Sequence, residues 1–137
     1  MTERATPLTI TGLAGIGLIH LLDSVDTFHE TRWLFWAYVA LMAATLVVSG
    51  ALLYRPEPRW LAAAGLVALL PLGGYLLSRT TGLPGADDDV GNWLDPLGLA
   101  SLWVEGAVLA TTSAALAFSP RRAPVPARPL TVGPLET

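Results

Sequence analysis

Four long apolar runs restrict what this sequence can fold into more than any other feature. They lie at about residues 8–25, 33–53, 60–77 and 98–118. Each is close to the roughly 20 residues that an α-helix needs to cross the hydrocarbon core of a bilayer. Polar or proline-containing segments separate the runs. The sequence therefore predicts an all-α fold, a bundle of four transmembrane helices that forms a single domain over residues 1–118.

The composition indicates that lipid, and not water, surrounds these runs. Of the 137 residues, 53% are hydrophobic and only 14% are charged, whereas soluble domains carry about 25% charged residues. There is no cysteine, which excludes disulfides, thiolate metal sites and cysteine nucleophiles. The sequence also lacks phosphate-binding glycine loops, Ser-His-Asp signatures and nucleic-acid-binding modules. We expect the lipid bilayer as a partner and no nucleic acid, and an enzyme is the least favoured class.

Arginine is distributed unequally between the two sides that four spans would create. The side of the termini holds six, namely Arg4, Arg55, Arg59, Arg121, Arg122 and Arg128, and the other side holds Arg32 and Arg79. Arginine-rich segments of membrane proteins stay in the cytoplasm. We therefore expect a multi-pass protein of the plasma membrane with cytoplasmic N and C termini. Residues 119–137, rich in proline and arginine, are expected to form a disordered cytoplasmic tail.

The opposite side is acidic and holds both histidines of the protein. On an ideal helix, with about 100° per residue, His20, Asp23 and Glu30 share one face. Asp26 lies beside that face, and His29 lies nearly opposite His20. An imidazole grouped with carboxylates suits Zn, Cu(II), Mn or non-haem Fe. The alternative is a helix end that is polar because it meets water, and for Asp26 and His29 we favour this interpretation.

Glu105 is the one charged residue within the last apolar run. It lies about 10 Å below the start of that run, at 1.5 Å per residue. An unpaired carboxylate at that depth is costly. We therefore expect Glu105 to be protonated, or to face the bundle interior with His20 or Arg79 as its partner. A structural pair between Arg79 and Glu105 is the favoured interpretation, and a loop aspartate is the alternative partner of Arg79.

These residues support three hypotheses about function. The first is an integral membrane protein with a polar site in the outer leaflet, built from His20, Asp23, Arg79 and Glu105. A divalent transition metal at this site would be held by His20, Asp23, Glu30 and Glu105. The second is an accessory or assembly subunit of a larger membrane complex, since a small bundle leaves little room for a substrate cavity. Three glycines of the first run, Gly12, Gly15 and Gly17, predict close packing on another helix, and a homo-oligomer or a membrane-protein partner fits this hypothesis. The third is a proton or ion pathway through His20 and Glu105.

The segment at residues 75–84, YLLSRTTGLP, resembles a signature of small, uncharacterised four-helix integral membrane proteins of actinobacteria. In that group, a histidine late in the first span precedes an acidic-His-Phe element, and an acidic residue lies within the fourth span. His20 and Glu105 match the first and last of these features. Residues 26–28 match the second imperfectly, because Thr27 stands where members often have histidine. The resemblance covers most of residues 8–118 and implies the membrane fold but no activity. It draws attention to His20, Arg79 and Glu105.

Overall fold

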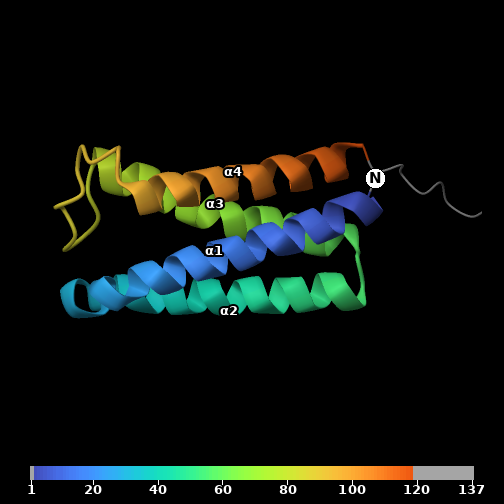
Figure 1. Ribbon diagram of the computed structural model, residues 1–137, viewed down its shortest axis with the longest axis horizontal. Coiled ribbons are helices and arrows are strands. Elements are labelled where there is room, and N and C mark those ends of the chain that lie inside the picture. The colour runs from blue at the N-terminus through green and yellow to red at the C-terminus, as the bar shows by residue number, and fades with distance from the viewer. Residues whose placement is uncertain (1, 119–137) are drawn as a thin grey trace, which may run out of the picture.

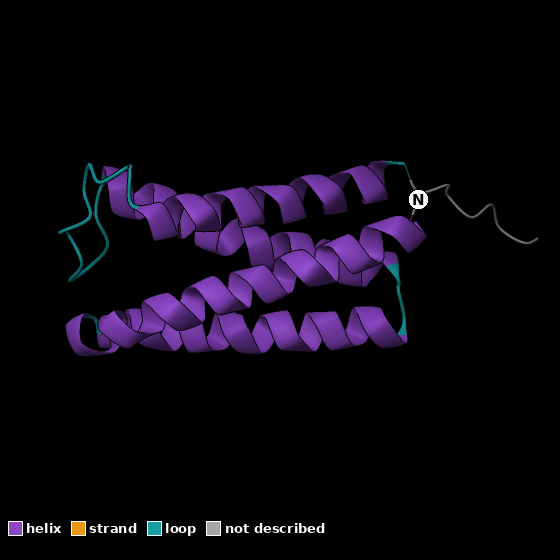
Figure 2. Cartoon of the chain, in the orientation of Figure 1, coloured by secondary structure: helices purple, strands orange, loops and turns teal. Residues whose placement is uncertain are grey.

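The chain forms an antiparallel bundle of four helices in a computed structural model that describes residues 2–118, apart from the side chains at positions 2, 3 and 26 (Figure 1). The helices are α1, Thr2–Glu30; α2, Arg32–Tyr54; α3, Pro58–Thr80; and α4, Pro96–Ala117. Figure 2 shows that helices make up nearly all of this part of the chain. The predicted all-α four-helix fold is confirmed. The expected tail, residues 119–137, lies outside the described residues.

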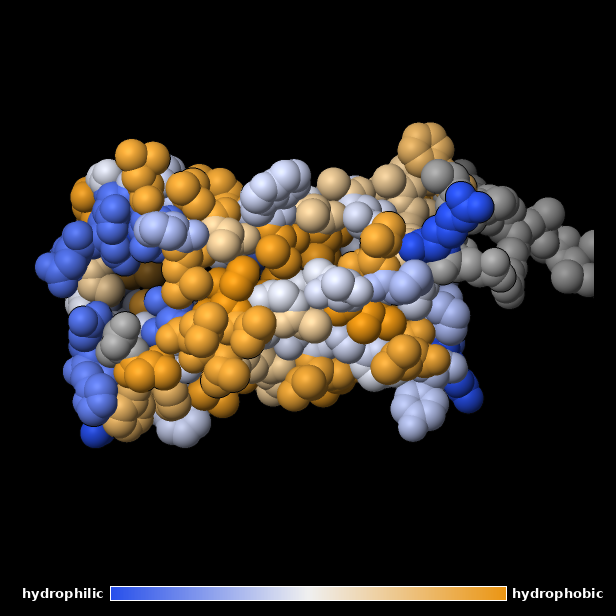
Figure 3. All heavy atoms as spheres, viewed as in Figure 1, coloured by the Kyte–Doolittle hydropathy of each residue, from blue (hydrophilic) through white to orange (hydrophobic). Residues whose placement is uncertain are grey.

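All four helices are long and apolar enough to cross a membrane. Large apolar side chains point outward along them; Leu46, Leu53 and Trp103 are 75%, 71% and 77% exposed. Figure 3 shows hydrophobic residues along the length of the bundle and hydrophilic residues gathered at its ends. In water such a surface would be unfavourable, because about 25 cal/mol is lost per Å² of exposed apolar area. The fold is therefore that of a multi-pass membrane protein.

Short connections place the polar segments at the two ends of the bundle. A single residue, Thr31, links α1 to α2, and residues 81–95 link α3 to α4 at the same end, which we call the loop end (left in Figure 1). The start of α1, the turn of residues 55–57 and the end of α4 lie at the opposite end, the termini end. Asp95 caps α4 by accepting a hydrogen bond from the backbone N–H of Gly98 at 2.6 Å, as is typical of an N-cap aspartate.

The helices pack as two pairs, α1 with α2 and α3 with α4, and α1 also packs closely on α4. A Cβ atom at Gly12 would collide with the side chain of Val108, and one at Gly15 would lie 3.0 Å from Val104. On the other side of α1, a Cβ atom at Gly17 would lie 3.2 Å from the Thr45 hydroxyl. The predicted close packing at these glycines is confirmed, but it is shared between two helices, α4 for Gly12 and Gly15 and α2 for Gly17. Contact between α2 and α3 is much less extensive.

The loop of residues 81–95 has a defined conformation held by backbone hydrogen bonds. Gly82 ends α3 with φ +77°, and its N–H donates to the carbonyl of Leu77 at 3.0 Å, as glycine does after a helix C-terminus. Leu83 and Ala86 then exchange backbone hydrogen bonds across a tight turn, in which Gly85 has φ +75°. The positive φ values explain why glycine occupies positions 82 and 85. This loop covers the loop end of the bundle.

Candidate functional site

A cavity of about 670 Å³ lies between α2 and α3 at the loop end; we call it the α2–α3 cavity. Small residues widen it, including Ala37 and Ala40 on α2 and Gly74 on α3. Pro71 also lines it, and proline cannot donate the helical hydrogen bond to the carbonyl four residues earlier. The expectation that a bundle of this size has little room for a substrate cavity was wrong.

Polar side chains from all four helices and the loop gather at one end of this cavity. They are His20 and Asp23 of α1, Tyr38 of α2, Tyr75, Ser78 and Arg79 of α3, Asp89, Asn92 and Asp95 of the loop region, and Ser101 of α4. The remaining lining is apolar for most of its area. The cavity thus has an apolar part between the helices and a polar part beneath the loop.

Arg79 is the centre of the polar part. Its side chain is 7% exposed, and Nη1 lies 2.6 Å from Asp89 Oδ2. Nη2 lies 3.7 Å from Asp95 Oδ2, which is longer than a hydrogen bond. The guanidinium also covers the ring of Tyr75 at 4.9 Å, an arrangement that favours a cation over an aromatic face. Arg79 therefore joins the loop to α3.

His20 is 6% exposed and lies on α1 against α2. Its Nδ1 is 3.0 Å from the carbonyl oxygen of Ile16, and because a carbonyl only accepts, Nδ1 carries a proton. Its ring meets Tyr38 edge to face at 4.9 Å, and the Tyr38 hydroxyl interacts with Asp23. Nε2 lies 3.9 Å from Glu105 Oε1, beyond hydrogen-bond length. In the neutral ring, Nε2 is thus an acceptor that has room for a donor.

Glu105 is fully buried beside the cavity and does not line it. The Ser101 hydroxyl donates to Oε1 at 2.5 Å, and Oε2 has no hydrogen-bond partner among the described residues. The expectation that Glu105 faces the bundle interior is met, with His20 as its nearest basic neighbour. The favoured pair between Arg79 and Glu105 is not formed in the described part of the chain. The loop aspartates take that role because the loop folds back over α3.

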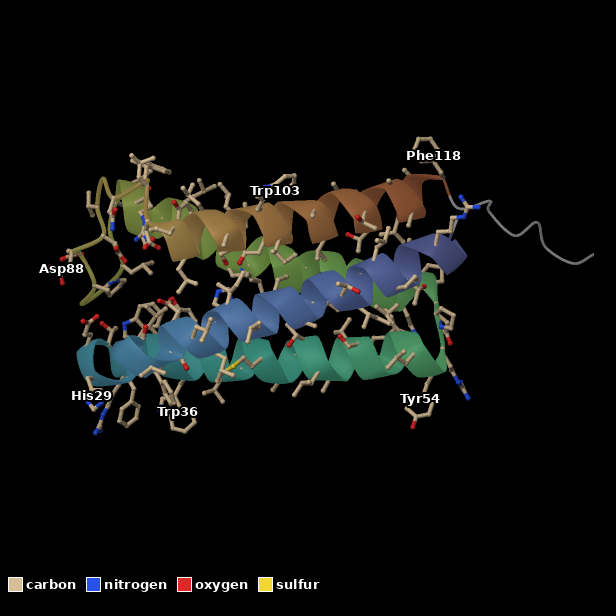
Figure 4. All side chains as sticks on the ribbon, viewed as in Figure 1. His29, Trp36, Tyr54, Asp88, Trp103 and Phe118 are labelled. Carbon is tan, nitrogen blue, oxygen red and sulfur yellow. The ribbon has the colours of Figure 1, made fainter. Side chains whose placement is uncertain are left out.

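The predicted metal site is not assembled. Within residues 4–25 and 27–118, no group of three or more His, Asp or Glu side chains is arranged to hold a metal ion. Glu30 is exposed at the end of α1 and does not line the cavity. It shares the angular position of His20, but ten residues of helix separate the two by roughly 15 Å. Figure 4 shows that His29 points away from the bundle, as expected for a water-facing side chain.

The loop is bonded to the other pair of helices as well as to its own. The Thr31 hydroxyl donates to the carbonyl of Gly85 at 3.0 Å, and Trp33 Nε1 donates to the carbonyl of Pro84 at 2.8 Å.

No protein family, curated protein or solved structure matches this chain. The resemblance to the actinobacterial group stays a prediction.

Sequence reasoning missed two aromatic members of the site. Tyr38 is not among the predicted site residues, and in the structure it faces His20 and Asp23. Tyr75 precedes the SRTTGLP segment, and its hydroxyl donates to the carbonyl of Trp93 at 3.2 Å. The available signal was spacing: Tyr75 lies four residues before Arg79, so the two share a helix face.

Proposed function

We propose that this protein binds a small amphipathic molecule from the bilayer in the α2–α3 cavity. The proposal depends on one observation: a single cavity contains both an apolar and a polar region. An apolar region lies between two membrane-spanning helices, and a buried polar region with Arg79 and His20 lies beneath the loop. A molecule with an apolar chain and a polar head matches both regions at once. A volume near 670 Å³ is within the usual range for small-molecule sites.

The cavity opens sideways toward lipid. Ala37, Ala40 and Leu70 line it and are also exposed on the surface of the bundle. They lie on α2 and α3, the two neighbouring helices with the least mutual contact. An apolar chain can therefore occupy the cavity while it remains continuous with the surrounding bilayer. The arginine distribution supports a polar end in the outer leaflet of the plasma membrane, with the termini in the cytoplasm.

A proton or ion pathway across the whole bundle has less support. His20 and Glu105 form one step near the loop end. Toward the termini end, the buried polar side chains within the described residues are hydroxyls, those of Thr9, Thr45 and Thr112. The last two donate to carbonyls of their own helices, as hydroxyls commonly do in apolar surroundings. No buried titratable side chain of this region, within the part of the chain that the structure describes, continues the path.

Filling the apolar region tests the proposal. Gly74 lines the cavity, and a Cβ atom there would meet nothing within 4 Å; Gly74→Leu therefore occupies cavity space without a clash. Gly106 on α4 has equally open surroundings and does not line the cavity, so Gly106→Leu is the matched control. Each protein is incubated with an equimolar mixture of oleoyl amphiphiles that have neutral, anionic and cationic heads, which serve as probes. Native mass spectrometry then gives the number of probe molecules bound to each protein.

We expect the wild type and Gly106→Leu to retain one probe molecule, and Gly74→Leu to retain much less. Equal retention by all three proteins would contradict the proposal, since binding would then be ordinary surface lipid. Absence of any retained probe in the wild type would contradict it as well. Circular dichroism of each variant establishes that the helices are intact.

A further inference from the structure

We infer that the head group bound in the α2–α3 cavity is uncharged, with an oxygen that accepts a hydrogen bond from Arg79 and a hydroxyl that donates to His20. This inference rests on the proposed function, because it names the ligand chemistry of the same cavity. Three features of the polar region carry it: the charge balance, the unused donors of the guanidinium and the free ring nitrogen of the histidine.

The charge balance disfavours an anionic head. Asp23, Asp89 and Asp95 line the polar region together with a single arginine. Asp89 and Asp95 already surround that guanidinium at 2.6 Å and 3.7 Å. An added anion would face three carboxylates, which repel it. Arg79 is thus not a vacant anion site.

A cationic head is opposed not by the charge balance but by the partners that the carboxylates already have. Each carboxylate has a partner: Asp23 interacts with the Tyr38 hydroxyl, Asp89 with Arg79, and Asp95 with Arg79 and the N–H of Gly98. The Tyr75 ring, which would attract a cation, is covered by the guanidinium at 4.9 Å. A cationic head group here would lie beside the guanidinium of Arg79.

Hydrogen-bonding capacity remains unused on Arg79. A guanidinium presents five N–H donors. At hydrogen-bond length, Nη1 reaches Asp89 and Ser78, and the guanidinium also interacts with the Tyr75 hydroxyl. The nearest acidic partner of Nη2 is 3.7 Å away. Nε has no partner among the described residues and is enclosed by protein, so Nη2 is the donor that a ligand can reach. A buried donor that stays unpaired costs about 1–3 kcal/mol. A carbonyl or ether oxygen of the ligand can accept from Nη2.

His20 supplies the complementary requirement. Its Nδ1 proton is committed to the Ile16 carbonyl at 3.0 Å, so the neutral ring offers an acceptor at Nε2. Glu105 Oε1, at 3.9 Å, is too distant for a hydrogen bond. His20 lines the cavity, and a ligand hydroxyl can donate to Nε2. An acceptor oxygen and a hydroxyl in one uncharged head describe an acylglycerol-like molecule.

Four probes with one oleoyl or oleyl chain test the head group on the wild-type protein. They are monoolein, with an ester and hydroxyls; methyl oleate, with an ester alone; oleoyl lysophosphatidylglycerol, which is anionic; and oleylamine, which is cationic at neutral pH. Native mass spectrometry in non-ionic detergent measures each dissociation constant. We expect monoolein to bind most tightly, with methyl oleate weaker and the two charged probes weakest. Tightest binding of either charged probe would overturn the inference.

Arg79→Lys isolates the guanidinium, because lysine keeps the charge beside Asp89 and loses the forked set of donors. We expect monoolein affinity to fall roughly ten- to hundredfold, the range for a hydrogen bond from a charged donor. Arg59→Lys is the control; Arg59 pairs with Glu57 at the termini end, and its replacement should leave affinity unchanged. Equal monoolein affinity in Arg79→Lys and the wild type would overturn the inference.

Comparison with Gly74→Leu separates the inference from the proposed function. If the charged probes bind best and Gly74→Leu abolishes that binding, the cavity binds amphiphiles and the head-group inference fails. If no probe responds to Gly74→Leu, the proposed function fails together with the inference. The head-group series on the wild type needs no variant, so it decides the question even if Arg79→Lys does not fold.

Discussion

Replacement of Gly12 by alanine gives the sharpest test of the packing between α1 and α4. The new Cβ would overlap Cγ2 of Val108. Val108 is 2% exposed and has no open space into which to move. Overpacking of this kind costs about 1–3 kcal/mol, while glycine to alanine within a helix gains about 1 kcal/mol from propensity. Gly106→Ala gains the same propensity without a clash, because nothing lies within 4 Å of its Cβ position.

The difference between these two variants therefore isolates the contact, and we expect Gly12→Ala to be less stable than Gly106→Ala by about 1–3 kcal/mol. Reversible unfolding in mixed micelles, followed by circular dichroism, measures it. Val108→Ala removes the methyl group that Gly12→Ala would meet, so the penalty should largely disappear in the double variant. Equal stability of Gly12→Ala and Gly106→Ala would refute the reasoning, and so would a penalty that persists without Val108.

Two further changes address the loop and the buried acid. Thr31→Val removes a hydrogen bond to the loop, and amide hydrogen exchange in residues 81–95 should quicken; an unchanged rate would mean that this bond does not hold the loop. Ser101→Ala removes the hydroxyl that donates to Glu105 at 2.5 Å, which should lower the free energy of unfolding by about 1–3 kcal/mol; a variant as stable as the wild type would show that Glu105 does not need this donor.

The helices were predictable because hydrocarbon imposes a simple rule on sequence. A span must be apolar over about 20 residues, with its backbone hydrogen bonds satisfied internally. The four runs therefore located α1 to α4, and the helix α1 was expected to continue beyond Asp23. Glu105 was expected to turn inward, since a carboxylate facing lipid is costly. These inferences depend on one residue or one segment at a time.

The site was less predictable because it depends on how the elements meet. His20 and Glu30 share an angular position on α1, yet only His20 is buried. The angular position of a residue does not tell how far along the helix it lies. Arg79 had two candidate partners, and the fold of the loop, not the depth of Glu105, selected Asp89. The cavity arises where small residues of α2 and α3 face each other, and a pattern within one helix does not show what lies opposite it.

The bonds from Thr31 and Trp33 to the loop have a consequence for the whole bundle. The loop continues from α3 into α4, so these two bonds tie the start of α2 to the α3–α4 pair beside the cavity. At the opposite end a three-residue turn joins α2 to α3. The two helix pairs are also held together by the close packing of α1 on α4. The edge of the cavity that the start of α2 forms is therefore held by hydrogen bonds that water can reach, while the contact between α1 and α4 is held by packing alone at its glycines.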